Sequence, residues 1–131
     1  MNQEIMIPVS IGELIDKITI LEIKKSRISD KAKLLNINHE LNALMNIYSK
    51  IKSNDGKITS LKEQLKKINS LLWDIEDEKR NHERLKNFDQ SFVKLARSVY
   101  IENDNRAKIK KEINILLNSG IVEEKSYSQY N

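Results

Sequence analysis

The stretch "FVKLARSVYIENDNRAKIKKEINILLNSG", residues 92–120, has a helical pattern whose character changes along its length. At about 100° per residue, its first half places apolar side chains on one face: Phe92, Leu95, Ala96 and Val99. The second half continues the same face with polar side chains: Asn103, Arg106, Lys110 and Asn114. The stretch predicts a long helix whose polar half is completed by an internal ion-pair network, by a ligand or by another protein.

The composition favours a single all-α domain. The chain has 131 residues with one Pro and three Gly, so few residues interrupt helices. The hydrophobic fraction of 39% and the charged fraction of 32% suit slender, solvated helices better than a thick globule. We expect one domain, residues 1–131, folded as a four-helix up-and-down bundle or as a pair of antiparallel helical hairpins.

Hydrophobic periodicity and turn residues divide the chain into four expected helices. Their ranges are 10–28, 30–53, 57–87 and 89–119, and the last two helices are the longest. Residues 1–9 are expected to form an extended leading segment, and residues 120–131 a polar tail in which Tyr127 and Tyr130 pack back on the bundle.

Capping and turn residues mark the ends of these helices. The expected N-caps are Ser10, Ser29 or Asp30, and Asp89. Ser10 and Glu13 have the spacing of a capping box, in which each side chain binds the backbone amide of the other residue. The turn formers between the second and third helices are Asn54, Asp55 and Gly56. Gly120 suits the position just after the last helix.

The charge pattern gives little support to nucleic-acid or membrane binding. The formal net charge is +4, but acidic residues are interspersed and only 5% of the residues are aromatic, so stacking platforms are scarce. Weak nucleic-acid binding is therefore only a third hypothesis. The chain has no cysteine, and no stretch has the pattern of a signal peptide or a membrane span. We expect a cytoplasmic protein that does not enter membranes.

Glu22 is the candidate for a buried charge on the first helix. It falls on the apolar face, whereas Glu13 and Asp16 are expected on the solvated side. A buried carboxylate needs a cation or hydrogen bonds, and we expect Arg106 and Lys110 of the fourth helix to supply them.

The polar cluster has further expected members: Asn103, Asn114, Glu76 and Glu83. One interpretation is an internal ion-pair network that sets the register of the helices. A second is a pocket in which Arg106 and Lys110 bind an anionic small ligand and the carboxylates act as acid or base. A third is an interface with another protein. All three interpretations stay open at this point.

A second candidate surface lies on an adjacent face of the fourth helix. Arg97, Tyr100 and Asp104 share that face at helical spacing, so a solvated surface with local pairing competes with a binding surface. Metal binding has weak support, because His82 lies near Glu78 without a matching motif on a facing helix. We expect no metal and no cofactor.

Long strings of the chain resemble a family of small microbial proteins known only as a domain of unknown function. The resemblance rests on "IPVSIGELIDKITILEIKKSRISDKAKLLNINHEL" (7–41), "LWDIEDEKRNHERLKNFDQSFVKLARSVYIENDNRAKIKKEIN" (72–114) and "EEKSYSQY" (123–130). One departure is Lys31, where the family pattern has Pro. The resemblance implies no established activity, so no catalytic residue is carried over.

The leading functional hypothesis is a non-enzymatic helical module that forms a homodimer or docks a protein partner through its third and fourth helices. Both helices lose their apolar stripe at a similar distance from their shared connection. This leaves a surface of mixed polarity that a protein partner would cover. The alternative, from a different class, is an enzyme or anion-binding protein with a site between the first, third and fourth helices. The sequence identifies no substrate.

Overall fold

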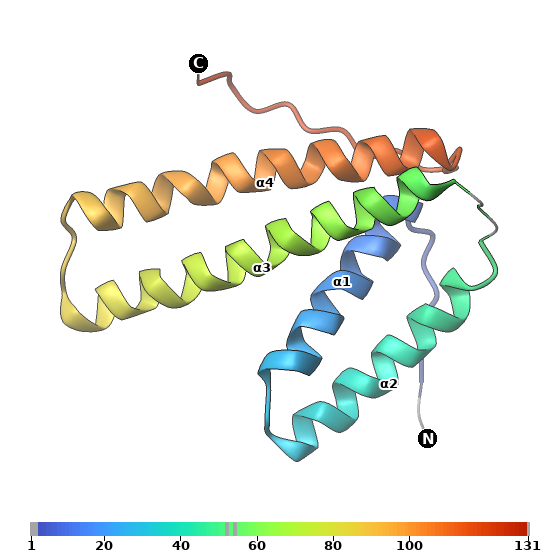
Figure 1. Cartoon of the computed structure of the whole chain (residues 1–131), viewed down its shortest axis with the longest axis horizontal. Coiled ribbons are helices and arrows are strands. Elements are labelled where there is room, and N and C mark those ends of the chain that lie inside the picture. The colour runs from blue at the N-terminus through green and yellow to red at the C-terminus, as the bar shows by residue number, and fades with distance from the viewer. Residues whose placement is uncertain (1–2, 52, 54, 131) are drawn as a thin grey trace.

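The computed structural model describes residues 3–51, 53 and 55–130 and confirms the predicted all-α fold. Its helices are α1 (Ile11–Arg27), α2 (Lys31–Tyr48), α3 (Gly56–Leu85) and α4 (Gln90–Leu116) (Figure 1). As expected, α3 and α4 are the long pair. The described ranges contain no strand, and none of their helices combines the length and the apolar character needed to cross a bilayer.

Each helix begins at a capping side chain. The N-caps are Ser10, Asp30, Asp55 and Asp89. Asp30 accepts a hydrogen bond from the amide of Lys33 at 3.0 Å, so α2 starts cleanly at Lys31 without a proline there. Ser10 accepts from the amide of Glu13 at 3.0 Å, but the carboxylate of Glu13 turns toward α4 instead of reaching back. Only half of the predicted capping box therefore forms.

The end of α2 differs from the expected bound at residue 53. The amides of Lys50 and Ile51 donate to the carbonyls of Ile47 and Tyr48, three residues back, at 3.1 and 2.9 Å. These tighter turns replace the α-helical bonds, so α2 ends at Tyr48. Two residues predicted for this region, Lys52 and Asn54, lie outside the described part of the chain.

The end of α4 also differs from the expectation, which placed it at Ser119 with Gly120 beyond. Asn118 takes the left-handed conformation, with φ of 52°, that helix ends commonly require. The amide of Ser119 then donates to the carbonyl of Asn114 at 2.8 Å and closes the helix at Leu116. An Asn thus performs the role that the sequence assigned to a Gly, because its short side chain tolerates this conformation.

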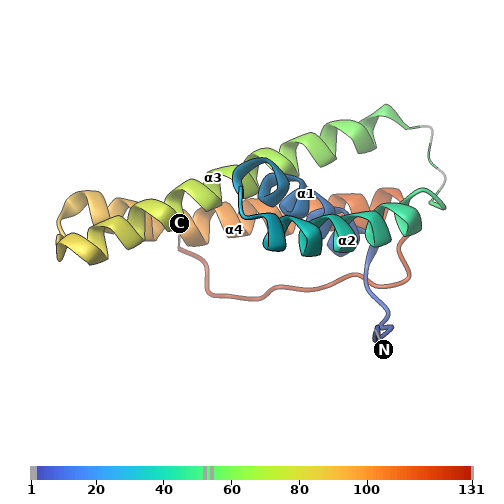
Figure 2. The ribbon, with the colours of Figure 1, turned by 90° about the horizontal axis from the view of Figure 1, so that it is seen from below.

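The helices form two antiparallel hairpins rather than a closed bundle (Figures 1 and 2). α1 packs against the other three helices, and α2 lies along α1. α2 also reaches α3 through Tyr48, whose ring lies 5.5 Å from the ammonium of Lys62. The α1–α2 hairpin covers only the part of the α3–α4 hairpin where α3 begins and α4 ends.

Two apolar clusters hold the hairpins together, and α1 contributes to both. The first joins α1 to α2 through buried Leu14, Ile18, Leu21, Ile37 and Leu41. The second joins α1 to α3 and α4 through Ile15, Leu61, Leu65 and Ile113. Because α1 is buried on two sides, it is the central element of the fold.

The rest of the α3–α4 hairpin extends beyond α1 and α2. We call this part, residues 76–102, the distal hairpin. On α3 the last buried residue is Ile75, and on α4 the first is Ile113. In the fully described range between them, from Glu76 to Glu112, no residue is buried. By contrast α1, with 17 residues, buries eight. The distal hairpin therefore has no core of its own.

Close approach of α1 and α4 depends on Gly12. A Cβ atom at this position would lie 2.5 Å from the carbonyl oxygen of Lys110 and 2.9 Å from Oδ1 of Asn114. Neither neighbour is free to move, because the first atom is helix backbone and the second accepts a hydrogen bond from the amide of Gly12 at 2.6 Å. Only glycine allows this helix contact.

We expect Gly12→Ala to destabilise the protein by about 2 kcal/mol, since the added methyl group forces α1 away from α4. The matched control is Gly56→Ala, where a Cβ would meet no atom within 4 Å. That change should be neutral or stabilising by about 0.5 kcal/mol. Urea denaturation followed by circular dichroism measures both, and equal effects of the two substitutions would contradict the close-contact argument.

Candidate functional site

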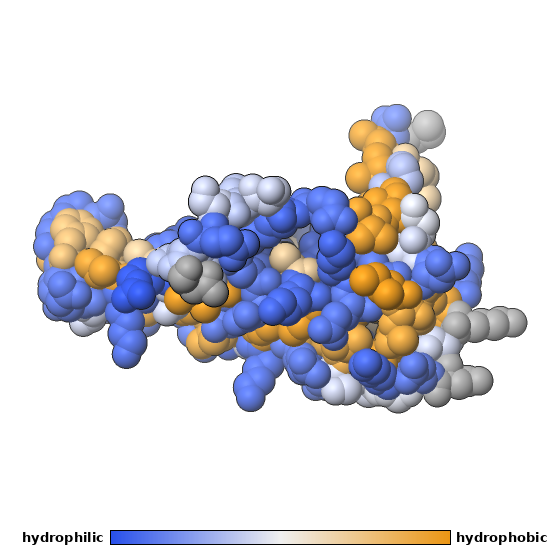
Figure 3. Space-filling model, turned by 90° about the horizontal axis from the view of Figure 1, so that it is seen from above, coloured by the Kyte–Doolittle hydropathy of each residue, from blue (hydrophilic) through white to orange (hydrophobic). Residues whose placement is uncertain are grey.

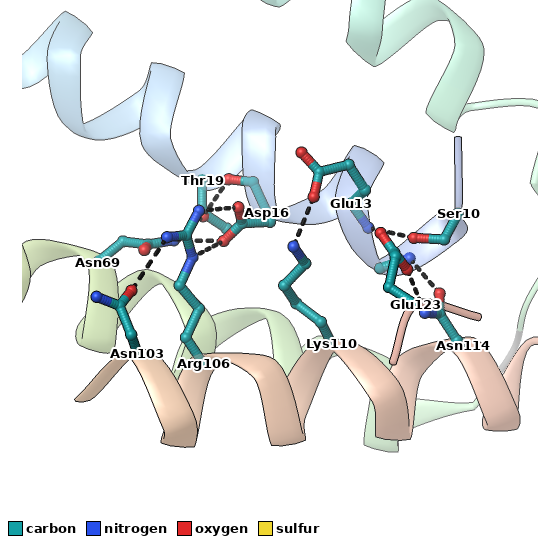
Figure 4. A network of polar contacts seen from close by, with 11 residues as sticks. Ser10, Glu13, Asp16, Thr19, Asn69, Asn103, Arg106, Lys110, Asn114 and Glu123 are labelled. Carbon is teal, nitrogen blue, oxygen red and sulfur yellow. Dashed lines mark hydrogen bonds and ion pairs between the residues drawn. The ribbon is translucent and has the colours of Figure 1, made fainter. Parts of the chain in front are cut away.

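The polar half of α4 faces α1, and an ion pair lies at its centre (Figure 4). Arg106 extends from α4 to Asp16, whose side chain is only 1% exposed. The Nε and Nη2 atoms of Arg106 donate to the two carboxylate oxygens at 2.9 and 2.5 Å. These bonds raise the pKa of Arg106 although its partial burial opposes the shift, so the guanidinium stays charged.

Asp16 receives a further hydrogen bond from α3. The Nδ2 atom of Asn69 donates to Asp16 at 2.9 Å and also contacts the hydroxyl of Thr19 at 3.0 Å. The hydroxyl of Thr19 donates to the backbone carbonyl of Asp16 at 2.7 Å. All three residues are buried. Helices α1, α3 and α4 thus meet around one carboxylate of α1, whose oxygens accept hydrogen bonds from side chains of α3 and α4.

α4 also binds the first turn of α1. Lys110 lies 2.5 Å from the carboxylate of Glu13, and the Oδ1 atom of Asn114 accepts the amide of Gly12 at 2.6 Å. Just beyond α4, the hydroxyl of Ser119 accepts the amide of Ile11 at 3.1 Å. The first two free amides of α1 are therefore satisfied by residues about one hundred positions away in the sequence.

The C-terminal tail, residues 120–130, adds a carboxylate to this network. Glu123 accepts a hydrogen bond from Nδ2 of Asn114 at 3.2 Å and interacts with the hydroxyl of Ser10. Burial alone would raise the pKa of Glu123, but its hydrogen bonds, first the one from Ser10, and the charge of Lys110 lower it below the ordinary value. Glu123 therefore binds as the carboxylate.

Beyond Glu123 the tail runs back along α4 and forms one wall of a cleft of about 570 Å³. Lys125 pairs with Asp104 at 2.7 Å, and the rings of Tyr100 and Tyr130 meet edge to face at 5.2 Å. The hydrogen bond from Lys125 lowers the pKa of Asp104, and burial opposes this shift. The expectation that Tyr130 packs back on the helices is confirmed, whereas Tyr127 stays largely exposed.

Six of the ten predicted site residues lie together. Arg106, Lys110, Asn103 and Asn114 face α1 or the cleft, and Tyr100 and Asp104 line the cleft beside them. Arg97 is exposed on α4, and Asp104 pairs with the tail instead of with it. The four polar residues of the opening stretch therefore belong to one surface.

The remaining three acidic candidates lie elsewhere, and the predicted partners of Glu22 were wrong. Glu22 faces α3, with Lys66 at 3.7 Å and Lys62 at 3.9 Å. Arg106 and Lys110 pair with other carboxylates, because α1 crosses the hairpin and turns a different face toward α4. Glu76 pairs with Lys79 and Arg80, and Glu83 pairs with Lys86, each within α3 or at its end.

Sequence reasoning missed the carboxylates that complete the network. Asp16 was expected in solvent and is instead almost fully buried, and the side chain of Glu13 is 28% exposed. The available signal was their spacing: positions 13 and 16 on α1 match positions 110 and 106 on α4 when the two helices run antiparallel. Asn69 and Glu123 carry no comparable signal, since helix order and the path of the tail determine their placement.

The side chains of this network hold α1 and α4 in position instead of presenting a free reactive group. Its central carboxylate is fully engaged, and both basic side chains that face α1 have acidic partners. In the described ranges, no three or more His, Asp or Glu side chains gather in a way that could hold a metal ion. The geometry favours a structural clamp between α1 and α4, with a cleft on its outer side.

The chain belongs to a family of unknown function, DUF6165, whose model matches residues 5–130. This match confirms the resemblance to an uncharacterised domain family. No curated protein and no solved structure matches the chain.

We expect Arg106→Met to cost about 3 kcal/mol of unfolding free energy, because it leaves the charge of Asp16 buried without a cation. Asp16→Asn in the same chain should recover part of this loss, since the buried charge is then removed. The matched control is Arg97→Met, an exposed position on the same helix, with an expected effect within about 0.5 kcal/mol. Equal losses for the two Arg variants would contradict the clamp.

Acidification should detach the tail from α4. Because the pKa values of Glu123 and Asp104 are lowered in the folded state, their contacts are fully present above about pH 4.5 and are lost as the pH falls through the lowered values. Amide NMR signals of residues 121–130 monitor the tail at each pH. Signals that change already near pH 6, or that persist until the helices unfold, would contradict this assignment.

Proposed function

We propose that the protein acts as a non-enzymatic module that forms a homodimer through its distal hairpin. The observation that supports this most strongly is the absence of any buried residue from Glu76 to Glu112, a range that is fully described. A pair of helices usually buries its apolar stripe against further helices. Here α1 and α2 end before they reach the distal hairpin (Figure 1).

Apolar side chains remain on the surface of this region. The most exposed are Leu85, Phe88, Val93 and, at the base of the hairpin, Leu71. Apolar surface is visible at the tip of the hairpin, at the left of Figure 3. Exposed apolar patches mark interaction sites in many proteins.

A groove between α3 and α4 provides a concave surface on which a second helical hairpin can dock. It has a volume of about 710 Å³ and contains apolar side chains from both helices: Leu71, Ile75 and Leu95. A second distal hairpin laid along this groove would complete a four-helix arrangement with coiled-coil-like packing. The molecule that fills the groove is then a second copy of this chain, and that copy docks through the same groove of its own distal hairpin.

The groove is lined by Glu78 on α3 and by two side chains of opposite charge on α4, Lys94 and Glu102. Lys94 lines it toward the tip of the hairpin, and Glu102 lines it two helical turns closer to α1. These positions are about 12 Å apart along α4. A two-fold axis near Ser98 would place Lys94 opposite Glu102 of the partner subunit, and the reverse. This arrangement favours an antiparallel homodimer over an unrelated partner.

The same composition that lacks cysteine supports a cytoplasmic setting for this assembly. Nucleic-acid binding is less favoured, because the basic side chains around α4 and the tail pair with carboxylates: Arg106, Lys110, Lys111 and Lys125. The phosphate backbone of a nucleic acid is bound by an extended row of cations, whereas the basic side chains here alternate with acidic partners.

Light scattering of the purified chain should give the mass of two chains at micromolar concentration. Leu95→Glu places a charge in the apolar groove and should yield a monomer at the same concentration. Its matched control is Ala96→Glu, which adds the same charge to an exposed neighbouring position outside the groove and should leave the dimer intact. Circular dichroism verifies that both variants are folded.

Charge exchange tests the antiparallel geometry. Lys94→Glu alone should weaken the dimer, and adding Glu102→Lys should restore it, because the two residues are too far apart on one helix to pair within a chain. A wild-type monomer at about 100 μM would overturn the homodimer. Dissociation by Ala96→Glu and Leu95→Glu alike would overturn the groove as its site.

A further inference from the structure

The cleft between α4 and the tail already binds anionic groups of its own chain. Both carboxylate oxygens of Glu124 lie near the ammonium of Lys111, at 2.8 and 3.1 Å. The carboxylate of Glu123 is bound by Ser10 and Asn114. The basic and amide side chains of this face of α4 are thus arranged to receive oxyanions, and two tail carboxylates occupy them.

The floor of the cleft keeps additional donors. Arg106 uses Nε and Nη2 for Asp16, while its Nη1 has only a 3.4 Å contact with Asn103. Figure 4 shows that Arg106 and Lys110 rise from the same side of α4 toward α1. Both residues line the cleft, and their side chains are 28% and 19% exposed.

The tail contacts that fill the cleft are weak. The side chains of Lys111 and Glu124 are 45% and 72% exposed, and an ion pair of this kind contributes at most about 1 kcal/mol. The tail itself has no helix between residues 121 and 130. A ligand that offers a denser negative charge than one carboxylate can therefore replace Glu124 without disturbing the helices.

We propose that this cleft binds a small molecule with clustered oxyanion groups, a phosphate ester or a polycarboxylate, through Arg106, Lys110 and Lys111. The tail forms one wall of the site, and the carboxylate of Glu124 competes with the ligand for Lys111. A cleft of about 570 Å³ falls within the range of small-molecule sites. Phosphate and carboxylate groups both match the planar donor edge of a guanidinium, so the two sources share one recognition chemistry.

Two probes distinguish these sources: pyrophosphate for phosphate esters and citrate for polycarboxylates. Each is titrated into the full-length chain while amide NMR signals of α4 and the tail are recorded. Saturable shifts at residues 103–111 and 121–130 with either probe support the site, and the tighter probe identifies the chemistry. Absence of saturable shifts with both probes up to about 10 mM would overturn it.

Variants separate a built site from general attraction to a basic protein. Lys111→Ala should weaken binding about fivefold, and Glu124→Gln should strengthen it about fivefold by freeing Lys111. The matched control is Lys67→Ala, which removes the same charge from an exposed position on α3 and should leave the affinity unchanged. Equal weakening by both Lys variants would overturn the proposal.

The test is independent of the proposed homodimer, because the groove of the distal hairpin and this cleft share no residue. A monomeric protein that binds pyrophosphate would reject the dimer and support the cleft. A dimer that binds neither probe would do the reverse.

Discussion

The carboxylate of Asp16 is almost completely buried, and its charge determines how the helices meet. A buried carboxylate is costly unless it is paired and hydrogen-bonded. Arg106 supplies the cation from α4, and Asn69 supplies an amide from α3. α1 can satisfy Asp16 only where these two side chains come together, which sets its position along the long hairpin. Gly12 then allows the backbones to approach closely enough for the contact to form.

The position of α1 places the two halves of α4 in different environments. The apolar half is left uncovered and the polar half is covered, which is the opposite of what hydrophobicity alone predicts. Its apolar half, with Leu95 as an example, lies on the distal hairpin, where no residue is buried. Its polar half, with Arg106 and Asn114, lies against α1, and Asn114 is 2% exposed. The polar residues of its second half are matched by polar residues within the chain, whereas none of the apolar residues of its first half is buried. This contrast is why an interface is placed at the distal end and a clamp at the other.

The C-terminal tail lies on the outer, solvent-facing side of the clamp between α1 and α4. Its residues bind α4 mainly through exposed ion pairs and one aromatic contact, all of which contribute little individually. Below it lie Arg106 and Lys110, which pair with α1 and also line the cleft. One set of basic residues can therefore hold the fold together and still recognise an anion, because a guanidinium has more than one donor edge.

The sequence by itself determined the all-α class, the number of helices, the N-caps Ser10 and Asp89, and that the last two helices are the longest, because helix periodicity and capping are local properties of the chain. It also indicated that Asn103, Arg106, Lys110 and Asn114 act together, since they share one helical face. Only the tertiary structure decided that their partners are Glu13 and Asp16 instead of Glu22. The physical reason is that a helix offers several faces, and the angle at which α1 crosses the hairpin selects which face meets α4. The same crossing decided how much of the hairpin stays uncovered, which no local pattern records.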